Sequence, residues 1–400
     1  MFLPDHAQLR TLSGTPAYVF DTDCFRRRIA HVKRLLSPRV HLCYAMKANP
    51  FLINTAVLDR YEVCSPGEFA ICERLGIPMS KIVLSGVYKE EAELRRVIAA
   101  YGKALTFTAE SLRQFQQINA IAKENGLCVR LLLRLTSGNQ FGIERNEIID
   151  LIKNRDLFEG VNIIGLQHFS GTQRHSLGKY EKELEMLDDL LDELRESGYE
   201  AQELEFGPGF YVEYFQNQKH YDEDALVSGF ARLLKQMRFQ GQIILELGRF
   251  LAAACGTYYT AVCDMKKNDG RQYCITDGGK HQLSYFGAMM GMKHPYVRVL
   301  SPRQDTKLRT PYTVCGALCT VNDILAQNLP LPRLEPGDIL EFQRAGAYCM
   351  CEGLSLFLSR DLPKIFLYNE QDGLIRLRGT IETYHLNMCE EEDNKDGKTA

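Results

Sequence analysis

Eight short apolar runs, separated by longer amphipathic stretches, recur through the middle of this 400-residue chain and constrain its fold more than any other feature. Short apolar runs bounded by polar or turn residues are typical of buried strands, and apolar residues spaced by three or four are typical of helices that bury one face. The expected strands are residues 41–46, 61–63, 82–84, 105–107, 129–133, 163–166, 204–206 and 243–245. The expected helices between them include residues 90–100, 112–123, 147–153, 180–196 and 222–237.

Eight strands with seven intervening helical patterns over about 220 residues match a (β/α)8 barrel of the TIM type in count and size. A doubly wound open sheet is the alternative, but it usually has fewer strands. We therefore predict an α/β protein whose barrel occupies residues 24–256, beginning with a helix at 24–36 that a capping cluster at 21–23 introduces.

After Gly256 the pattern changes to alternating strands and turns. The expected strands there are residues 257–265, 273–275, 312–314 and 339–342, with a Pro-Gly turn at 335–338. This predicts a mainly β domain formed by residues 1–23 and 257–385, which completes the active site. The polar residues 386–400 are expected to form a tail.

Charge and composition exclude several classes of function. A formal net charge of -3 and a pI near 6.3 provide no basic field for nucleic acid, so a small-molecule or protein partner is expected. We find neither a signal-peptide pattern nor a membrane-length apolar run. Thirteen scattered cysteines, an odd number, favour reduced thiols and a cytoplasmic protein. Their spacing is unlike that of a zinc site, so no metal is expected.

Polar, ionisable or glycine residues follow all eight expected strands, which in a barrel places them at one catalytic face. Lys47 follows the first of these strands. A strand-end lysine is usually a solvated surface residue, but the polar, ionisable and glycine residues expected beside Lys47 at this face favour a reactive amine. The other strand ends carry residues 64–68, Ser85-Gly86, 108–110, Arg134, His168, Gly207-Pro208-Gly209 and Glu246-x-Gly248-Arg249.

The last two strand ends have the composition of a phosphate site. Glycines at 207, 209 and 248 let backbone N–H groups approach a phosphate, and Arg249 can add a charge-assisted contact. A reactive lysine opposite such a site suggests pyridoxal 5'-phosphate. Glu246 is the candidate partner for the pyridine nitrogen, although it could also be an ordinary salt-bridged strand-end residue.

Five motifs in order extend this hypothesis to a family. They are Tyr44-Ala45-Met46-Lys47-Ala48-Asn49, His168-x-Ser170-Gly171-Thr172, Glu246-x-Gly248-Arg249, Gly316-x-x-Cys319-x-x-x-Asp323 and Ala345-Gly346-Ala347-Tyr348. Together they resemble the fold type III pyridoxal-phosphate decarboxylases, the group of ornithine and diaminopimelate decarboxylases. The resemblance covers essentially the whole chain.

The resemblance implies roles for the matching positions. Lys47 would be the Schiff-base lysine, His168 would stack on the cofactor ring, and Cys319 would line the substrate pocket and handle the proton that replaces carbon dioxide. The phosphate would be held by Gly207, Gly209, Gly248, Arg249 and Tyr348, and Ser170 or Thr172 would also reach the cofactor. Arg134, Thr320 and Asp323 would complete the substrate pocket. In the family the cysteine crosses a dimer interface, which implies a homodimer with shared sites.

Ordinary structural explanations stay open for three of these residues. His168 could be a capped core histidine, Cys319 a small buried hydrophobe, and Tyr348 a packing residue. Departures from the family pattern bear on the substrate. Thr320 follows the pocket cysteine where decarboxylases of free diamino acids typically have an acidic residue, and Gln140 stands where lysine is usual.

A buried threonine cannot offset the charge of a distal ammonium. We therefore expect free lysine, ornithine and diaminopimelate to be poor substrates. The Gly-x-x-Cys-Thr motif more closely resembles members of secondary metabolism that act on siderophore precursors or on aminoacyl groups tethered to a carrier protein.

Several alternatives keep the same barrel and lysine. A decarboxylase of a free diamino acid and an amino-acid racemase share the whole fold, but Glu246 argues against the racemase. A pyridoxal-phosphate homeostasis protein would lack the β domain, and a Schiff-base aldolase would be colourless.

Overall fold

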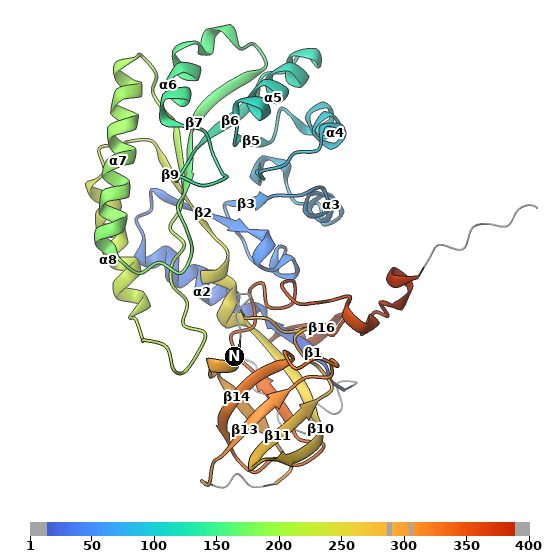
Figure 1. Cartoon of the computed structure of the whole chain (residues 1–400). Coiled ribbons are helices and arrows are strands. Elements are labelled where there is room, and N and C mark those ends of the chain that lie inside the picture. Colours follow the sequence, from blue (N-terminus) through green and yellow to red (C-terminus); the bar gives the residue numbers. More distant parts are fainter. Residues whose placement is uncertain (1–13, 286–289, 304–306, 389–400) are drawn as a thin grey trace, which may run out of the picture. The chain divides into compact units, whose positions relative to one another are not determined.

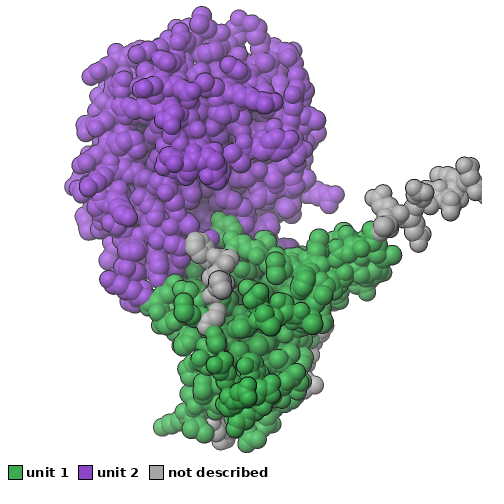
Figure 2. All heavy atoms as spheres, viewed as in Figure 1, with its two compact units in different colours: residues 1–23, 214–218, 255–400 green, residues 24–213, 219–254 purple. Residues whose placement is uncertain are grey.

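The computed structural model describes residues 14–285, 290–303 and 307–388 of the chain. It divides into two compact units, coloured separately in Figure 2. The barrel unit comprises residues 24–213 and 219–254, and the β unit comprises residues 1–23, 214–218 and 255–400. Residues 214–218, which the sequence analysis placed in the barrel, cluster with the β unit.

The barrel unit contains a closed barrel of eight parallel strands, so the predicted fold class is confirmed. Each strand pairs with its neighbours in sequence, and β2 closes the ring by pairing with β9 through Val40 with Ile243 and Cys43 with Glu246. The strands are β2 (Val40–Ala45), β3 (Arg60–Val63), β4 (Ile82–Leu84), β5 (Thr106–Ala109), β6 (Val129–Leu135), β7 (Val161–Phe169), β8 (Glu203–Gly207) and β9 (Gln242–Leu247).

Helices α3 to α8 lie around the outside of these strands (Figure 1). Several begin where a side chain caps the first turn: the Ser65, Ser111 and Asp222 side chains accept backbone N–H groups of Glu68, Gln114 and Ala225. The bounds are α2 (Thr22–Leu35), α3 (Pro66–Arg74), α4 (Glu91–Tyr101), α5 (Leu112–Glu124), α6 (Arg145–Lys153), α7 (Leu177–Glu196), α8 (Glu223–Gln236) and α9 (Arg249–Ala252). Short 3-10 turns in this unit are η1 (Met46–Ala48), η2 (Pro50–Leu52), η3 (Met79–Lys81) and η4 (Arg155–Leu157).

The prediction of seven helical patterns is wrong at the first crossover. Residues 46–59, all of which the structure describes, contain only the 3-10 turns η1 and η2. Pro50 lacks an N–H group and disfavours helical backbone at Asn49, which is extended at φ -164°. The Asn49 side chain then accepts the Phe51 N–H group, so the chain turns sharply just after Lys47.

The strands extend further than the apolar runs predicted. Thr108, Arg134, His168 and Glu246 were expected just after strands but lie within β5, β6, β7 and β9. Alternate residues of a barrel strand point inward, so a polar side chain at such a position does not interrupt the ladder. The ionisable groups therefore stand on rigid strands.

The β unit is built around a nine-stranded sheet in the order β14-β13-β11-β10-β1-β16-β17, with β15 pairing β10 and β12. Its core packs Ala17, Val19, Tyr259, Leu300, Ile339 and Phe366. The strands are β1 (Ala17–Asp21), β10 (Gly256–Asn268), β11 (Arg271–Thr276), β12 (Val297–Leu300), β13 (Thr310–Cys315), β14 (Ile324–Leu331), β15 (Ile339–Phe342), β16 (Lys364–Asn369) and β17 (Gly373–Arg378). Its 3-10 turns are η6 (Met290–Met292), η7 (Phe357–Ser359) and η8 (Tyr384–Asn387), and the turn η5 (Ala253–Cys255) lies where the chain passes from the barrel unit into the β unit.

Three further observations concern the chain as a whole. Of the tail predicted at residues 386–400, the part from residue 389 onward lies outside the described residues. The cysteines within the described ranges are not joined in disulfides. None of the helices that the structure describes combines the length and the apolar composition needed to cross a bilayer.

Candidate active site

Lys47 lies in η1, directly after β2, and its amine faces two carboxylates from other strands. The Nζ atom donates to Glu62 of β3, lies 3.4 Å from Oε1 of Glu246 of β9, and lies 3.6 Å from the sulfur of Cys64. The Lys47 side chain is 39% exposed, whereas Glu62 is 3% exposed. The structure thus brings two predicted residues, Lys47 and Glu246, together around Glu62, which the sequence analysis had not singled out.

The two carboxylates differ in acidity. Burial raises the pKa of Glu246 to about 8, and the charge of Glu62 reinforces this shift. Burial would also raise the pKa of Glu62, but the Lys47 ammonium and hydrogen bonds from Glu246 and Lys47 lower it overall. Lys47 and Glu62 therefore form the ion pair near neutral pH, and Glu246 holds a proton beside them.

Glycines bring the loops after β7 and β8 into contact. Gly209 has φ +56°, and a Cβ atom there would overlap the carbonyl oxygen of Gly171. The Gly209 carbonyl accepts the Arg174 N–H group at 2.9 Å, and Tyr180 donates its hydroxyl to the Pro208 carbonyl at 2.9 Å. Glycine is required at residue 209 because a side chain there would clash with the facing loop and keep the two backbones apart.

Three more residues predicted to bind the phosphate, Gly207, Gly248 and Arg249, lie at or just after the ends of β8 and β9. Gly207 ends β8, where a Cβ atom would overlap the Phe169 ring, and Gly248 packs against Ala45 and Ala48 beside Lys47. Arg249 is the first residue of α9 and is half-buried. Ser170 and Thr172 both line an open pocket of about 430 Å³ on the β7–α7 loop, so the choice between them stays open.

His168 lies at the end of β7 and is 2% exposed. Its Nδ1 atom faces the Leu135 carbonyl at 3.2 Å and its Nε2 atom lies 3.3 Å from the carboxylate of Glu183, a residue of α7. Glu183 also pairs with Arg174 at 2.8 Å. Burial opposes ionisation of Glu183, but the hydrogen bond from His168 and the charge of Arg174 lower its pKa.

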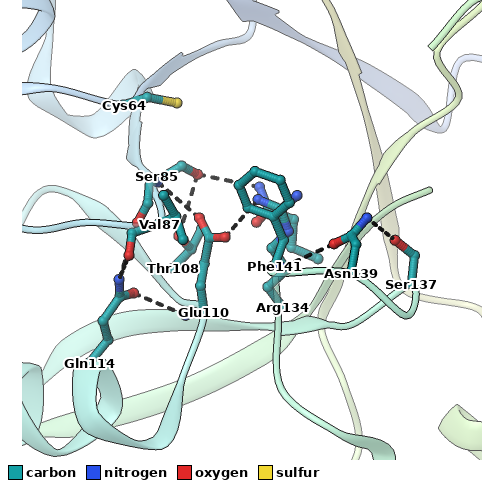
Figure 3. Close-up of polar contacts among 12 residues, drawn as sticks. Cys64, Ser85, Val87, Thr108, Glu110, Gln114, Arg134, Ser137, Asn139 and Phe141 are labelled. Atoms are coloured by element: carbon teal, nitrogen blue, oxygen red, sulfur yellow. Dashed lines mark hydrogen bonds and ion pairs between the residues drawn. The ribbon is translucent and has the colours of Figure 1, made fainter. Parts of the chain in front are cut away.

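The Arg134 side chain contacts Glu110 and Phe141 within the barrel unit. Its guanidinium pairs with Glu110 at 2.9 Å and lies over the Phe141 ring at 4.7 Å, as Figure 3 shows. Glu110, in turn, accepts the Gly86 N–H group at 3.1 Å and is almost fully buried. The Arg134 charge is therefore offset within the barrel unit.

In the β unit, Cys319, Thr320 and Asp323 share one loop, residues 316–323. Asp323 is 2% exposed, and its two carboxylate oxygens accept the N–H groups of Lys280 and Leu318, each at 2.7 Å. The backbone of Gly316 bonds to that of Asp323 at 3.0 Å, which closes the loop. Cys319 is exposed, which rules out the buried-hydrophobe explanation, and the Thr320 hydroxyl accepts the Asn322 N–H group at 3.3 Å.

Tyr348 lies elsewhere in the β unit and is partly exposed. Its φ of +63° is unusual for a tyrosine, and its carbonyl accepts the N–H groups of Cys351 and Glu352. This backbone is strained, and strain of this kind often accompanies a functional position.

Comparison with known proteins assigns the family. The profile described as "Pyridoxal-dependent decarboxylase, pyridoxal binding domain" matches residues 22–253, which is more than half of the chain and spans the barrel. The chain belongs to the pyridoxal-dependent decarboxylases. The fold type III resemblance inferred from the motifs is thereby confirmed.

Three relatives show the range of the family around this chain. The L-glutamyl-[BtrI acyl-carrier protein] decarboxylase of Niallia circulans is 26% identical over 98% of both chains. The 2-[(L-alanin-3-ylcarbamoyl)methyl]-2-hydroxybutanedioate decarboxylase of Staphylococcus aureus is 26% identical over 88% of this chain and 94% of its own. The crystal structure of Helicobacter pylori diaminopimelate decarboxylase complexed with L-lysine superposes with a TM-score of 0.82, 22% identity, and 96% and 98% coverage.

The chain is accordingly a pyridoxal-phosphate-dependent carboxy-lyase that acts on an amino acid or an amino-acid derivative. The racemase, aldolase and homeostasis-protein alternatives do not fit this assignment. The barrel also fits the cofactor: Lys47 offers a partly exposed amine at a strand end, and Gly209 lets the backbones of the loops after β7 and β8 approach each other closely.

Glu62 and Glu183 were missed from the sequence for different reasons. Glu62 interrupts the short apolar strand 61–63, and a carboxylate inside such a strand is itself a signal, because it is costly to bury without a partner. Glu183 gives no comparable signal, because it is one of many acidic residues on the amphipathic helix α7.

Proposed function

We propose that this enzyme decarboxylates an amino-acid derivative whose distal end carries no free ammonium. The candidates are a siderophore precursor or an aminoacyl group tethered to a carrier protein, in secondary metabolism. The observation that carries this proposal is the chemistry of the loop 316–323. Both carboxylate oxygens of its single acidic residue, Asp323, accept backbone N–H groups.

The loop offers a ligand only neutral groups. Cys319 presents a thiol, and Thr320 a hydroxyl whose oxygen accepts the Asn322 N–H group, so its hydrogen can be donated. A hydroxyl donor suits the carbonyl oxygen of an amide or a thioester. It cannot offset the charge of an ammonium. The names of the Niallia circulans and Staphylococcus aureus relatives, which describe an acylated and a carbamoyl substrate, support this class.

We infer the following roles in the barrel unit. Lys47 would hold the cofactor through its amine, and the backbone at Gly207, Gly209 and Gly248 with Arg249 would bind its phosphate. Glu246 would face the pyridine nitrogen, where its carboxylate would keep that nitrogen protonated. His168 would stack on the ring, fixed in orientation by Leu135 and Glu183, and Ser170 or Thr172 would complete the contacts. When bound, the cofactor supplies an electron sink for the charge left as carbon dioxide departs.

The β unit would supply the remaining groups. By the family resemblance, Tyr348 would add its hydroxyl to the phosphate, Cys319 would deliver the proton that replaces carbon dioxide, and Thr320 would contact the substrate. Arg134 was also predicted to contact substrate. Its ion pair with Glu110 instead supports a role in shaping the barrel mouth. Asp323, likewise predicted to contact substrate, is better supported as the residue that holds the loop.

We propose a homodimer for the same protein. A group of exposed apolar side chains between residues 354 and 388 of the β unit supports a second copy as the partner, since exposed apolar patches usually mark interfaces. Its members are Leu354, Leu356, Phe357, Leu358, Tyr384, Leu386 and Met388. We also propose a cytoplasmic location, which the reduced form of the described cysteines supports.

A substrate panel scored by carbon dioxide release tests the proposed substrate class. We expect release from aminoacyl groups on a carrier protein or from amide-linked amino-acid derivatives. Free lysine, ornithine and diaminopimelate should react at least tenfold more slowly. Rapid turnover of one of those three diamino acids would overturn the proposal in favour of a diaminopimelate- or ornithine-type enzyme.

The variant Thr320→Glu sharpens the test. A carboxylate at this position should shift the ratio of kcat/KM toward free diamino acids, because it supplies the missing countercharge. Thr320→Ser is the matched control, since it keeps a neutral hydroxyl and should keep the wild-type preference. Equal substrate preferences in the Glu and Ser variants would show that residue 320 does not recognise the distal group of the substrate.

A further inference from the structure

The barrel interior holds two more carboxylates, both on β8 and both facing inward. Glu203 is ion-paired, with Arg60 at 2.6 and 2.7 Å and with Arg130 at 2.6 Å. Glu205, two residues later, is fully buried and accepts one hydrogen bond, from Nε2 of Gln167 at 2.7 Å. Among the residues that the structure describes, no basic side chain lies within ion-pair distance of Glu205.

Glu205 lies one layer deeper in the barrel than the carboxylates at Lys47. It pairs in register with Ile244 of β9, and Glu246 is two residues further along the same inward face. Its neighbours with ionisable side chains are Cys43 on β2, Arg60 and Glu62 on β3, Glu203 on its own strand and Glu246 on β9. Gln167 on β7 is neutral, and it also lies 3.4 Å from the Ser85 hydroxyl.

The cations of this interior are already engaged. Lys47 lies within ion-pair distance of Glu62 and Glu246, whereas Arg60 and Arg130 both pair with Glu203. An ionised Glu205 would therefore be a buried charge without a counterion, which is among the least favourable arrangements in a protein. Consistently, burial raises the pKa of Glu205 to about 7, with Glu62 and Glu203 adding to the shift and Gln167 and Arg60 opposing it.

We propose that Glu205 is a positioning residue that stays an uncharged carboxylic acid in the working enzyme and so adds no negative charge beside Glu62 and Glu246. Its proton lies on Oε2, the oxygen that accepts no hydrogen bond from Gln167. A neutral Glu205 removes a repulsive charge from beside Glu246 and lets Glu246 ionise more readily. The link to catalysis rests on the role proposed above for Glu246, but the charge state of Glu205 does not.

Thermal unfolding of the full-length enzyme tests the charge state directly. A group whose pKa is raised by folding stabilises the fold fully below its unfolded pKa, and that stability is lost as pH rises through its folded pKa, here about 7. Glu205→Gln cannot ionise. Its melting temperature should match wild type at pH 5 and exceed it by several degrees at pH 8.

Glu203→Gln is the matched control, because it changes the same residue type two positions earlier on the same face. This substitution removes the countercharge of two guanidinium groups and should destabilise the protein at both pH values. A Glu205→Gln variant that loses the same stability at pH 5 and pH 8, as the control does, would overturn the proposal.

Two further measurements keep the proposal falsifiable if stability proves uninformative. Infrared spectra of wild type at pH 6 should show the carbonyl stretch of a buried carboxylic acid that is lost in Glu205→Gln and kept in Glu203→Gln. Absence of that difference would overturn the assignment of the proton.

In the holoenzyme, the alkaline side of the pH–activity profile should be flatter for Glu205→Gln than for wild type, with similar activity near pH 6.5. An unchanged profile combined with the expected melting behaviour would remove the catalytic link alone. If no substrate is turned over at all, the proposed function fails while the melting and infrared results still decide the state of Glu205.

Discussion

At the scale of single residues, Lys47 is held by a pair of carboxylates rather than by one. Glu62 carries the ion pair, and its charge is the second largest cause of the raised pKa of Glu246. The acidity of the residue proposed to face the pyridine nitrogen is therefore set by a neighbouring strand. Glu62 thus tunes Glu246 as well as holding the lysine.

Removing the Glu62 charge should make Glu246 a stronger acid. In Glu62→Gln, we expect the acid limb of the pH dependence of kcat/KM to move to lower pH, by on the order of one pH unit. Kinetics of the holoenzyme across the pH range measure the shift. Glu62→Asp keeps the charge and should keep the wild-type midpoint, so equal midpoints in all three proteins would contradict the tuning role.

At the scale of elements, the catalytic face depends on how closely the βα loops approach. The loops after β7 and β8 meet at Gly209, where the backbone has positive φ and no room for a side chain. The two loops are joined by the hydrogen bond between Arg174 and Gly209. These two loops, which are proposed to bind the phosphate together with Gly248 and Arg249, are thus connected through their backbones.

A methyl group at this contact should separate the loops. For Gly209→Ala we expect at least a tenfold loss of pyridoxal phosphate affinity, because the substitution combines backbone strain with overlap at Gly171. The measurement is cofactor titration followed by visible absorbance. Gly178→Ala, in helix α7 with open space around it, is the control and should bind as wild type. Unchanged cofactor affinity in Gly209→Ala would rule out this role of the two loops.

Sequence patterns predicted much of the fold and part of the site, and the reasons differ by element. Lys47, Glu246 and the glycines could be found because chemistry gathers at the strand ends of a barrel. The crossover after Lys47 was expected to be helical, although Asn49-Pro50 already disfavours a helix. Strands β12, β14, β16 and β17 were missed because their apolar and polar residues alternate only weakly. Glu183 needed the packing of α7 to be recognised.

At the scale of the whole molecule, the exposed apolar group of the β unit should decide the oligomeric state. A double variant, Phe357→Asp with Leu386→Asp, places charge on two members of this group, which are 44% and 58% exposed. We expect light scattering to show a monomer for this variant and the proposed dimer for wild type, and activity to fall in the variant if sites are shared.

Leu157→Asp is the control for this experiment. Leu157 is 74% exposed but belongs to the barrel unit, so its substitution should leave the oligomer intact. A wild-type protein that is monomeric at micromolar concentration would exclude the proposed homodimer.

In the loop 316–323, the residues that hold the backbone in place differ from those proposed to contact the substrate. This difference affects how new substrate specificities can arise. The path of the loop is held by Asp323 and by the tight packing of Gly279 and Gly316 around that carboxylate, not by the side chains of Cys319 and Thr320. Residues 320–322 can therefore be varied together in a library while the scaffold positions stay fixed. Such a loop could diversify repeatedly without the chain losing its fold.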